Sequence, residues 1–268
     1  MSSELKRIKK RKETKRELNK IYDNSENALI IHYSCESFYD IGDGRTPRVT
    51  SIAIRNLKTA QTESFSIHKI AERKRMPINE AQNRYDDLEK EMLDEYFEYI
   101  RTHQGFTFIH WNMRDINYGF SAIEHRYQVL GGDPHCIDDS RKFDLARAMV
   151  ALYGREYASH GDHGRLHSLI ELNKITKKGI LTGTEEAEAF KNAEYIKMHQ
   201  STLRKIDIFP DILERTIDGS LKTNATWLDR YGVHPKIILD YIQQHWGWAI
   251  IVIISVILGI VASLSVIF

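Results

Sequence analysis

The chain has few of the residues that mark specialised protein classes. Its 268 residues include only two cysteines, Cys35 and Cys136, which lie far apart and form no CxxC pair. This usage favours a reducing compartment over a secreted one. Hydrophobic residues make up 42% and charged residues 28%, which excludes a disordered, collagen-like or disulfide-scaffold chain. The sequence also has no glycine-rich phosphate loop and no GxSxG nucleophile elbow.

Positive charge is concentrated at the start of the chain, although the formal net charge is only +1. Residues 1–20 contain nine basic and three acidic residues, and Lys9, Lys10, Arg11 and Lys12 are consecutive. We therefore treat residues 1–24 as a basic arm. Such an arm can pair with nucleic-acid phosphates or with an anionic membrane surface, or it can be a solvated, frayed helix.

The end of the chain is strongly apolar. Residues 249–268 are twenty residues without a charge, roughly 30 Å of helix at about 1.5 Å per residue. This length predicts a transmembrane tail anchor over 246–268, with Trp246 and Trp248 at the headgroup level and a linker with a helix over 223–245. Because all charges precede the tail, the bulk of the protein is expected in the cytoplasm.

Small side chains recur every four residues inside this tail, at Ser255, Gly259 and Ser263. Such a spacing places them on one helix face, where transmembrane helices can approach each other closely. The pattern leaves two interpretations open, a homo-oligomer formed through the tail or ordinary small residues of a membrane helix.

Residues 25–222 carry the patterns of an α/β domain. Apolar or alternating runs predict strands at 28–33, 49–55, 63–68 and 106–110. Helical spacing predicts helices at 78–103, 116–130, 141–152, 166–175, 184–200, 207–216 and 235–245. This order favours a mixed sheet flanked by helices.

Three short motifs accompany these elements. Ser34-Cys35-Glu36 ends the first strand, His110 and Asp115 follow the buried strand at 106–110, and Ala187 to Asn192 lie on a helix. In order and spacing, these motifs resemble those of the DEDDh proofreading-type 3′–5′ exonucleases, which have a ribonuclease H-like fold. The resemblance covers roughly residues 28–200.

The resemblance implies a centre of four acidic residues that hold two Mg²⁺ or Mn²⁺ ions, with a histidine as general base. Here Glu36 and Asp115 are retained as the acids that could still bind metal. Ser34 and Asn192 stand where the family has Asp, and Ala187 stands where it has His. Glu188 lies one turn before Asn192 and is a candidate replacement ligand. Trp111, near Asp115, is a candidate platform for stacking a base.

Three functions follow from these features. The first is a membrane-anchored, exonuclease-like protein with a degraded catalytic centre that binds nucleic acid or a nucleotide, as a defence-type sensor and effector would. The second is an active, metal-dependent 3′–5′ exonuclease that uses Glu36, Asp115 and Glu188. The third is a membrane-tethered scaffold for protein partners.

Overall fold

The computed structural model describes residues 3–37, 46–77, 80–226, 229 and 247–267. Its centre is a five-stranded sheet with the strand order β3-β2-β1-β4-β5. The strands are β1 (Ala28–Cys35), β2 (Val49–Asn56), β3 (Thr62–Ser66), β4 (Thr107–His110) and β5 (Lys142–Asp144). β2 runs antiparallel to both β1 and β3, whereas β1 pairs in parallel with β4 and β4 with β5.

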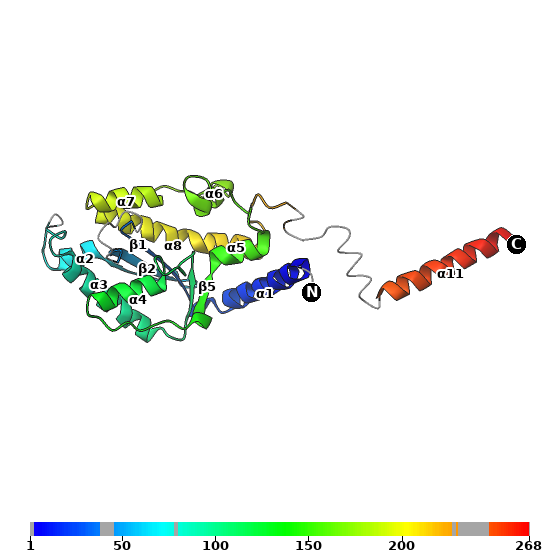
Figure 1. The fold of residues 1–268 in the computed structure, drawn as a ribbon, viewed down its shortest axis with the longest axis horizontal. Helices are drawn as coiled ribbons and strands as arrows, with labels where there is room; N and C mark the ends of the chain where they lie inside the picture. The colour runs from blue at the N-terminus through cyan, green and yellow to red at the C-terminus, as the bar shows by residue number, and fades with distance from the viewer. Residues whose placement is uncertain (1–2, 38–45, 78–79, 227–228, 230–246, 268) are drawn as a thin grey trace.

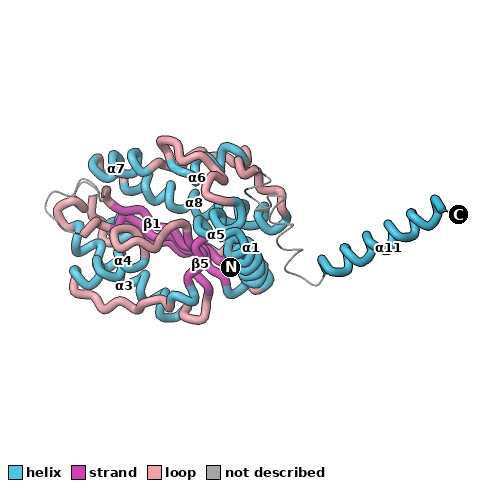
Figure 2. Tube along the Cα trace, turned by 45° about the vertical axis from the view of Figure 1, so that its right-hand side comes forward, coloured by secondary structure: helices cyan, strands magenta, loops and turns pink. Residues whose placement is uncertain are grey.

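Helices cover both faces of this sheet, as Figures 1 and 2 show. Helices α3 and α4 lie on one side, and α5, α7 and α8 lie on the other (Figure 1). The helices are α1 (Ser3–Asp23), α2 (Ile67–Arg73), α3 (Tyr85–Thr102), α4 (Phe120–Val129), α5 (Leu145–Tyr153), α6 (Gly164–Leu172), α7 (Gly183–Lys191), α8 (Tyr195–Asp218) and α11 (Gly247–Ile267). Two short 3-10 turns, η1 (Ser25–Asn27) and η2 (Asp139–Arg141), precede β1 and β5.

Strand β1 shows why the sheet is buried on both faces. Its first seven residues are all buried, and the two faces of the strand enter different clusters. Ile31 and Tyr33 pack with residues of α3 and α4, whereas Ala28 and Ile30 pack with residues of α5 and α8. A central strand covered by helices on both sides needs such a continuous apolar run. The prediction of an α/β domain with a mixed sheet flanked by helices is therefore confirmed.

Several predicted boundaries differ from the structure. The predicted helix at 141–152 begins with the three-residue strand β5, whose residues pair with Phe108–His110. The predicted helix at 184–200 is divided into α7 and α8 by a turn at 192–194. Helix α8 in turn continues through the segment predicted as a separate helix at 207–216, although it contains Pro210.

The predicted transmembrane tail requires a correction. Helix α11 forms in the apolar segment, but its side chains are described only at Gly247 and over 250–259. Among the described residues, no helix combines the length and apolarity needed to cross a membrane. This finding overturns the predictions of a tail anchor and of single-pass membrane localisation.

The residues predicted for that tail are placed only in part. Ser255 lies within α11, where its hydroxyl donates to the carbonyl of Ile251 at 2.8 Å, and Gly259 lies one turn further on. Trp246 and the side chains of Trp248 and Ser263 lie outside the described part of the chain, as does most of the predicted linker.

Candidate functional site

The carboxyl ends of β1, β4 and β5 meet at one edge of the sheet, because these three strands are parallel. The strand order reverses at β1, whose neighbours β2 and β4 lie on opposite sides. In open α/β sheets, ligands bind outside the carboxyl ends of the strands at such a switch point. A ligand site is therefore expected at the edge that follows Ser34 and His110.

A buried polar network lies at this edge, and we call it the carboxyl-edge cluster. It consists of Ser34 on β1, Glu186 on α7, and Ser201, Thr202 and Lys205 on α8. One carboxylate oxygen of Glu186 accepts from the hydroxyls of Ser34 at 3.1 Å and Ser201 at 3.2 Å. The same oxygen accepts from the ammonium of Lys205 at 2.7 Å.

Thr202 ties this network to the sheet. Its hydroxyl lies 2.6 Å from that of Ser34 and 2.9 Å from that of Ser51 on β2, and it donates to the carbonyl of Met198 at 3.0 Å. Hydroxyl groups suit this position because each can both donate and accept. Helix α8 is thus hydrogen-bonded to the middle of the sheet through buried side chains.

The charges in the cluster are largely withdrawn from water. The side chains of Lys205 and Glu186 are only 8% and 14% exposed. An ammonium group already occupies the space beside the carboxylate, so a divalent cation there would have to displace it or be repelled by it. The other partners of the carboxylate are neutral hydroxyls, which are weak ligands compared with the carboxylates that Mg²⁺ prefers.

His32 lies on the same face of β1, two residues before Ser34. It is 5% exposed, and neither ring nitrogen has a hydrogen-bond partner among the described residues. Its ring meets that of Phe209 edge-on at a centroid distance of 5.8 Å. Burial, and then the nearby charge of Lys205, lower the pKa of His32 well below its ordinary value. The imidazole is therefore neutral at physiological pH.

The retained acids Glu36 and Asp115 occupy different surroundings from Glu186. Glu36 is half-buried after β1, and its carboxylate receives the backbone N–H of Arg48 at 3.4 Å. Asp115 is exposed in the loop between β4 and α4, where its carboxylate accepts from the backbone N–H of Asn117 at 2.9 Å. The acid that organises this loop is Asp144, which accepts from the backbone N–H of Asn112 at 3.1 Å and caps α5.

The third predicted motif falls on α7 and on the turn that follows it. Thr182 caps α7 in a capping box with Glu185, so the helix begins at Gly183, one residue before the predicted start at 184. In this position Glu186 meets Ser34, whereas Glu188 is exposed and Asn192 is the exposed residue that ends the helix. Ala187 is half-buried.

Trp111, the predicted stacking residue, is half-buried and follows β4 directly. Its ring stacks on that of Phe209 from α8, with a centroid distance of 5.9 Å and an interplanar angle of 16°. Trp111 and His32 therefore share Phe209 as a neighbour. Tyr118 adds a second half-buried aromatic ring near this edge, stacked on Tyr33 at 4.7 Å.

These residues do not fit a two-metal centre. Of the four positions that the resemblance assigns to ligands, Ser34 is bound into the carboxyl-edge cluster, while Asp115 and Asn192 are exposed on separate segments. Within the described ranges, no group of three or more His, Cys, Asp or Glu side chains could hold a metal ion. The oxygen atoms around Ser34 belong to hydroxyls and to a carboxylate that is paired with an ammonium group. They are weak ligands for Mg²⁺ or Mn²⁺.

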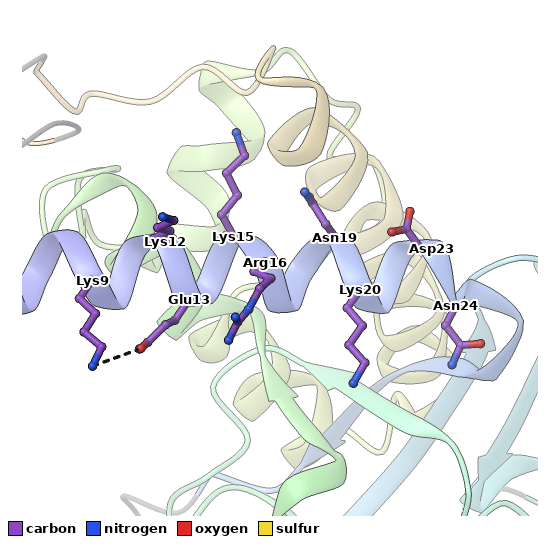
Figure 3. Close-up of a pocket in the computed structure, with 9 residues that line it drawn as sticks. All are labelled: Lys9, Lys12, Glu13, Lys15, Arg16, Asn19, Lys20, Asp23 and Asn24. Atoms are coloured by element: carbon purple, nitrogen blue, oxygen red, sulfur yellow. Dashed lines mark ion pairs between the residues drawn. The ribbon is translucent and has the colours of Figure 1, made fainter.

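The basic arm forms a second feature with functional potential. It is the helix α1, and a groove of about 980 Å³ runs along its outer side. Figure 3 shows the side chains that line this groove: Lys9, Lys12, Glu13, Lys15, Arg16, Asn19, Lys20, Asp23 and Asn24. Lys10 is exposed outside this lining, and Arg11 is half-buried.

Neither a search of protein-family models nor a search of curated proteins finds a match for this chain. The site must therefore be interpreted from its own geometry. Sequence reasoning identified Ser34 but missed Glu186, Ser201, Thr202 and Lys205. These last three residues fall between the predicted helices at 184–200 and 207–216, so no helical face was assigned to them. Their spacing was the available signal, because residues at i, i+1 and i+4 lie on one side of a helix.

Proposed function

We propose that this chain binds a nucleic-acid end or a nucleotide at the carboxyl edge of the sheet and does so without a two-metal hydrolytic centre. The carboxyl-edge cluster carries this proposal. The Lys205 ammonium, paired with Glu186, lies at the edge where the exonuclease resemblance would require divalent cations. A binding protein needs no metal pair there, whereas phosphodiester hydrolysis does.

The sheet has the mixed type on which this proposal draws. In the order β3-β2-β1-β4-β5, β2 runs antiparallel to its two neighbours, and β1, β4 and β5 are parallel. Trp111 and Tyr118 give the same edge two partly exposed aromatic rings. Such rings suit a base or a single strand, because every base has a face that can stack.

The test combines binding and cleavage by the full chain. Labelled single-stranded DNA and RNA would be incubated with the protein in Mg²⁺, in Mn²⁺ and in EDTA. We expect retarded oligonucleotide in all three conditions and no shortening from the 3′ end. Trp111→Ala should weaken binding at least tenfold, and Glu188→Gln, at an exposed position, should leave it unchanged.

Two results would contradict the proposal. Metal-dependent trimming that is lost in Asp115→Ala would identify an active exonuclease. Absence of binding to either oligonucleotide and to mononucleotides, in a sample with a cooperative unfolding transition, would favour the scaffold function.

A further inference from the structure

Helix α1 presents one side to the protein and the other to solvent. Thr14, Leu18 and Ile21 are buried, and the two apolar residues join the core formed with α5 and α8. The nine residues that line the α1 groove, drawn in Figure 3, are all exposed, and helical geometry spreads them over the sides of α1 away from these three. The helix is thus held on the domain by its apolar face while its basic face stays open.

The basic face carries charge that the described residues leave largely uncompensated. Among those residues, the face has one ion pair, between Lys9 and Glu13, at 3.9 Å with both side chains more than half exposed. Lys12, Arg16 and Lys20 follow one another at four-residue intervals. Like charges at this spacing destabilise a helix. A ligand of opposite charge would remove this cost.

We propose that the α1 groove binds the sugar-phosphate backbone of double-stranded nucleic acid. The choice of nucleic acid as the partner rests on the proposed function, but the groove is a different surface from the carboxyl edge. Lys12, Arg16 and Lys20 form a stripe about 12 Å long at 1.5 Å per residue, which allows contacts with several phosphates of one backbone.

The residues that line the groove favour a nucleic-acid duplex over a lipid surface or a single strand. A helix that inserts into a lipid surface needs several apolar residues on its exposed side. Of the apolar side chains described on α1, Leu18 and Ile21 face the protein core and Ile8 is 38% exposed. A groove for single strands needs aromatic rings on which bases stack, and none lines this groove. Contacts from Lys, Arg and Asn to phosphate and sugar carry no sequence information, so binding is expected to be independent of sequence.

The experiment measures the salt dependence of duplex binding by the full chain. Fluorescence anisotropy would follow a labelled blunt duplex of about 20 base pairs across a KCl series. The variant Lys12→Gln/Arg16→Gln/Lys20→Gln is compared with Lys58→Gln/Arg75→Gln/Lys178→Gln, which removes the same charge at exposed positions on other elements. Each phosphate contact contributes about 0.9 to the slope of log K against log salt. The first variant should therefore lower the slope by about 2.7, and the control should retain it.

Four outcomes would overturn the inference: equal slopes for the two variants, no duplex binding by the wild type, a larger loss of single-strand than of duplex binding in the first variant, or binding to phosphatidylserine vesicles without binding to duplex. The first variant leaves the carboxyl-edge cluster intact. Failure of the proposed function alone would therefore appear as duplex binding with the expected slope, together with no binding of a single-stranded end.

Discussion

A pair of buried histidines makes the stability of this protein sensitive to acid. His68 on α2 and His199 on α8 are 8% and 6% exposed, and their ring centroids are 4.8 Å apart. His68 Nδ1 and His199 Nε2 have no hydrogen-bond partner among the described residues. Burial, followed by the neighbouring charges of His68 and Lys69, lowers the pKa of His199 from 6.5 to about 4. Burial likewise lowers the pKa of His68, although Glu72 opposes that shift.

The lowered pKa of His199 determines how the free energy of unfolding changes with pH. Between pH 6.5 and about 4 the unfolded chain binds a proton at position 199 that the folded chain does not bind. The free energy of unfolding is therefore retained above pH 6.5 and falls as the pH is lowered through this window. A pKa that drops from 6.5 to about 4 corresponds to about 3 kcal/mol over the whole interval. The local slope approaches about 1.4 kcal/mol per pH unit.

The assay is urea denaturation at half-unit steps from pH 7 to pH 4, for wild type and for His199→Gln, whose side chain does not titrate. The difference in unfolding free energy between the two proteins should change by about 3 kcal/mol across the series, in favour of the variant at low pH. His125→Gln, at an exposed position, is the matched control. Parallel curves for wild type and His199→Gln would refute the reasoning, whatever the cost of the substitution at pH 7.

Three further substitutions test the packing. Lys205→Met should lower the unfolding free energy by about 3 kcal/mol by urea denaturation, because it leaves the Glu186 carboxylate without its cation, and adding Glu186→Gln should recover most of that loss. A variant pair with no recovery would contradict this account. Arg126→Met should cost about 3–5 kcal/mol, since the guanidinium pairs with the fully buried Glu89 at 2.6 Å; a loss below 1 kcal/mol would argue against it. Gly119→Ala should cost at least about 2 kcal/mol in thermal unfolding, because its Cβ would lie 2.6 Å from a backbone carbonyl carbon, and an unchanged melting temperature would count against that clash.

Hydrophobic patterning predicted the parts of the fold that bury long apolar runs. The runs at 28–33 and 49–55 became β1 and β2 because a strand covered on one or both faces needs that pattern. Strand β5 was missed because three residues, Lys142–Asp144, are too short to show a period. Helix α8 was predicted in two pieces with a gap at 201–206, and Pro210 falls inside the second piece. Ile206, Phe209 and Ile212 around Pro210 are fully buried, and this packing holds the helix together.

The candidate site was harder to predict than the fold. Ser34 was identified through the resemblance, as the residue that stands where the family has Asp at the end of the first strand. Glu186 was passed over in favour of Glu188 because Glu188 lies one turn before Asn192. In the structure Glu188 and Asn192 are both exposed, and Glu186 is the residue of α7 that contacts Ser34. Lys205 lies far from Ser34 in the sequence, so only the packing of α8 on the sheet brings them together.

The carboxyl-edge cluster also limits how this chain can change by mutation. If aspartate replaced Ser34, a second carboxylate would stand beside Glu186, and the single ammonium of Lys205 could balance only one of them. If Lys205 were lost first, Glu186 would be left with two neutral hydroxyls as its donors. Each single step toward an acidic centre is therefore less stable than the present network. An acidic centre at this edge would require simultaneous substitutions at Ser34 and Lys205.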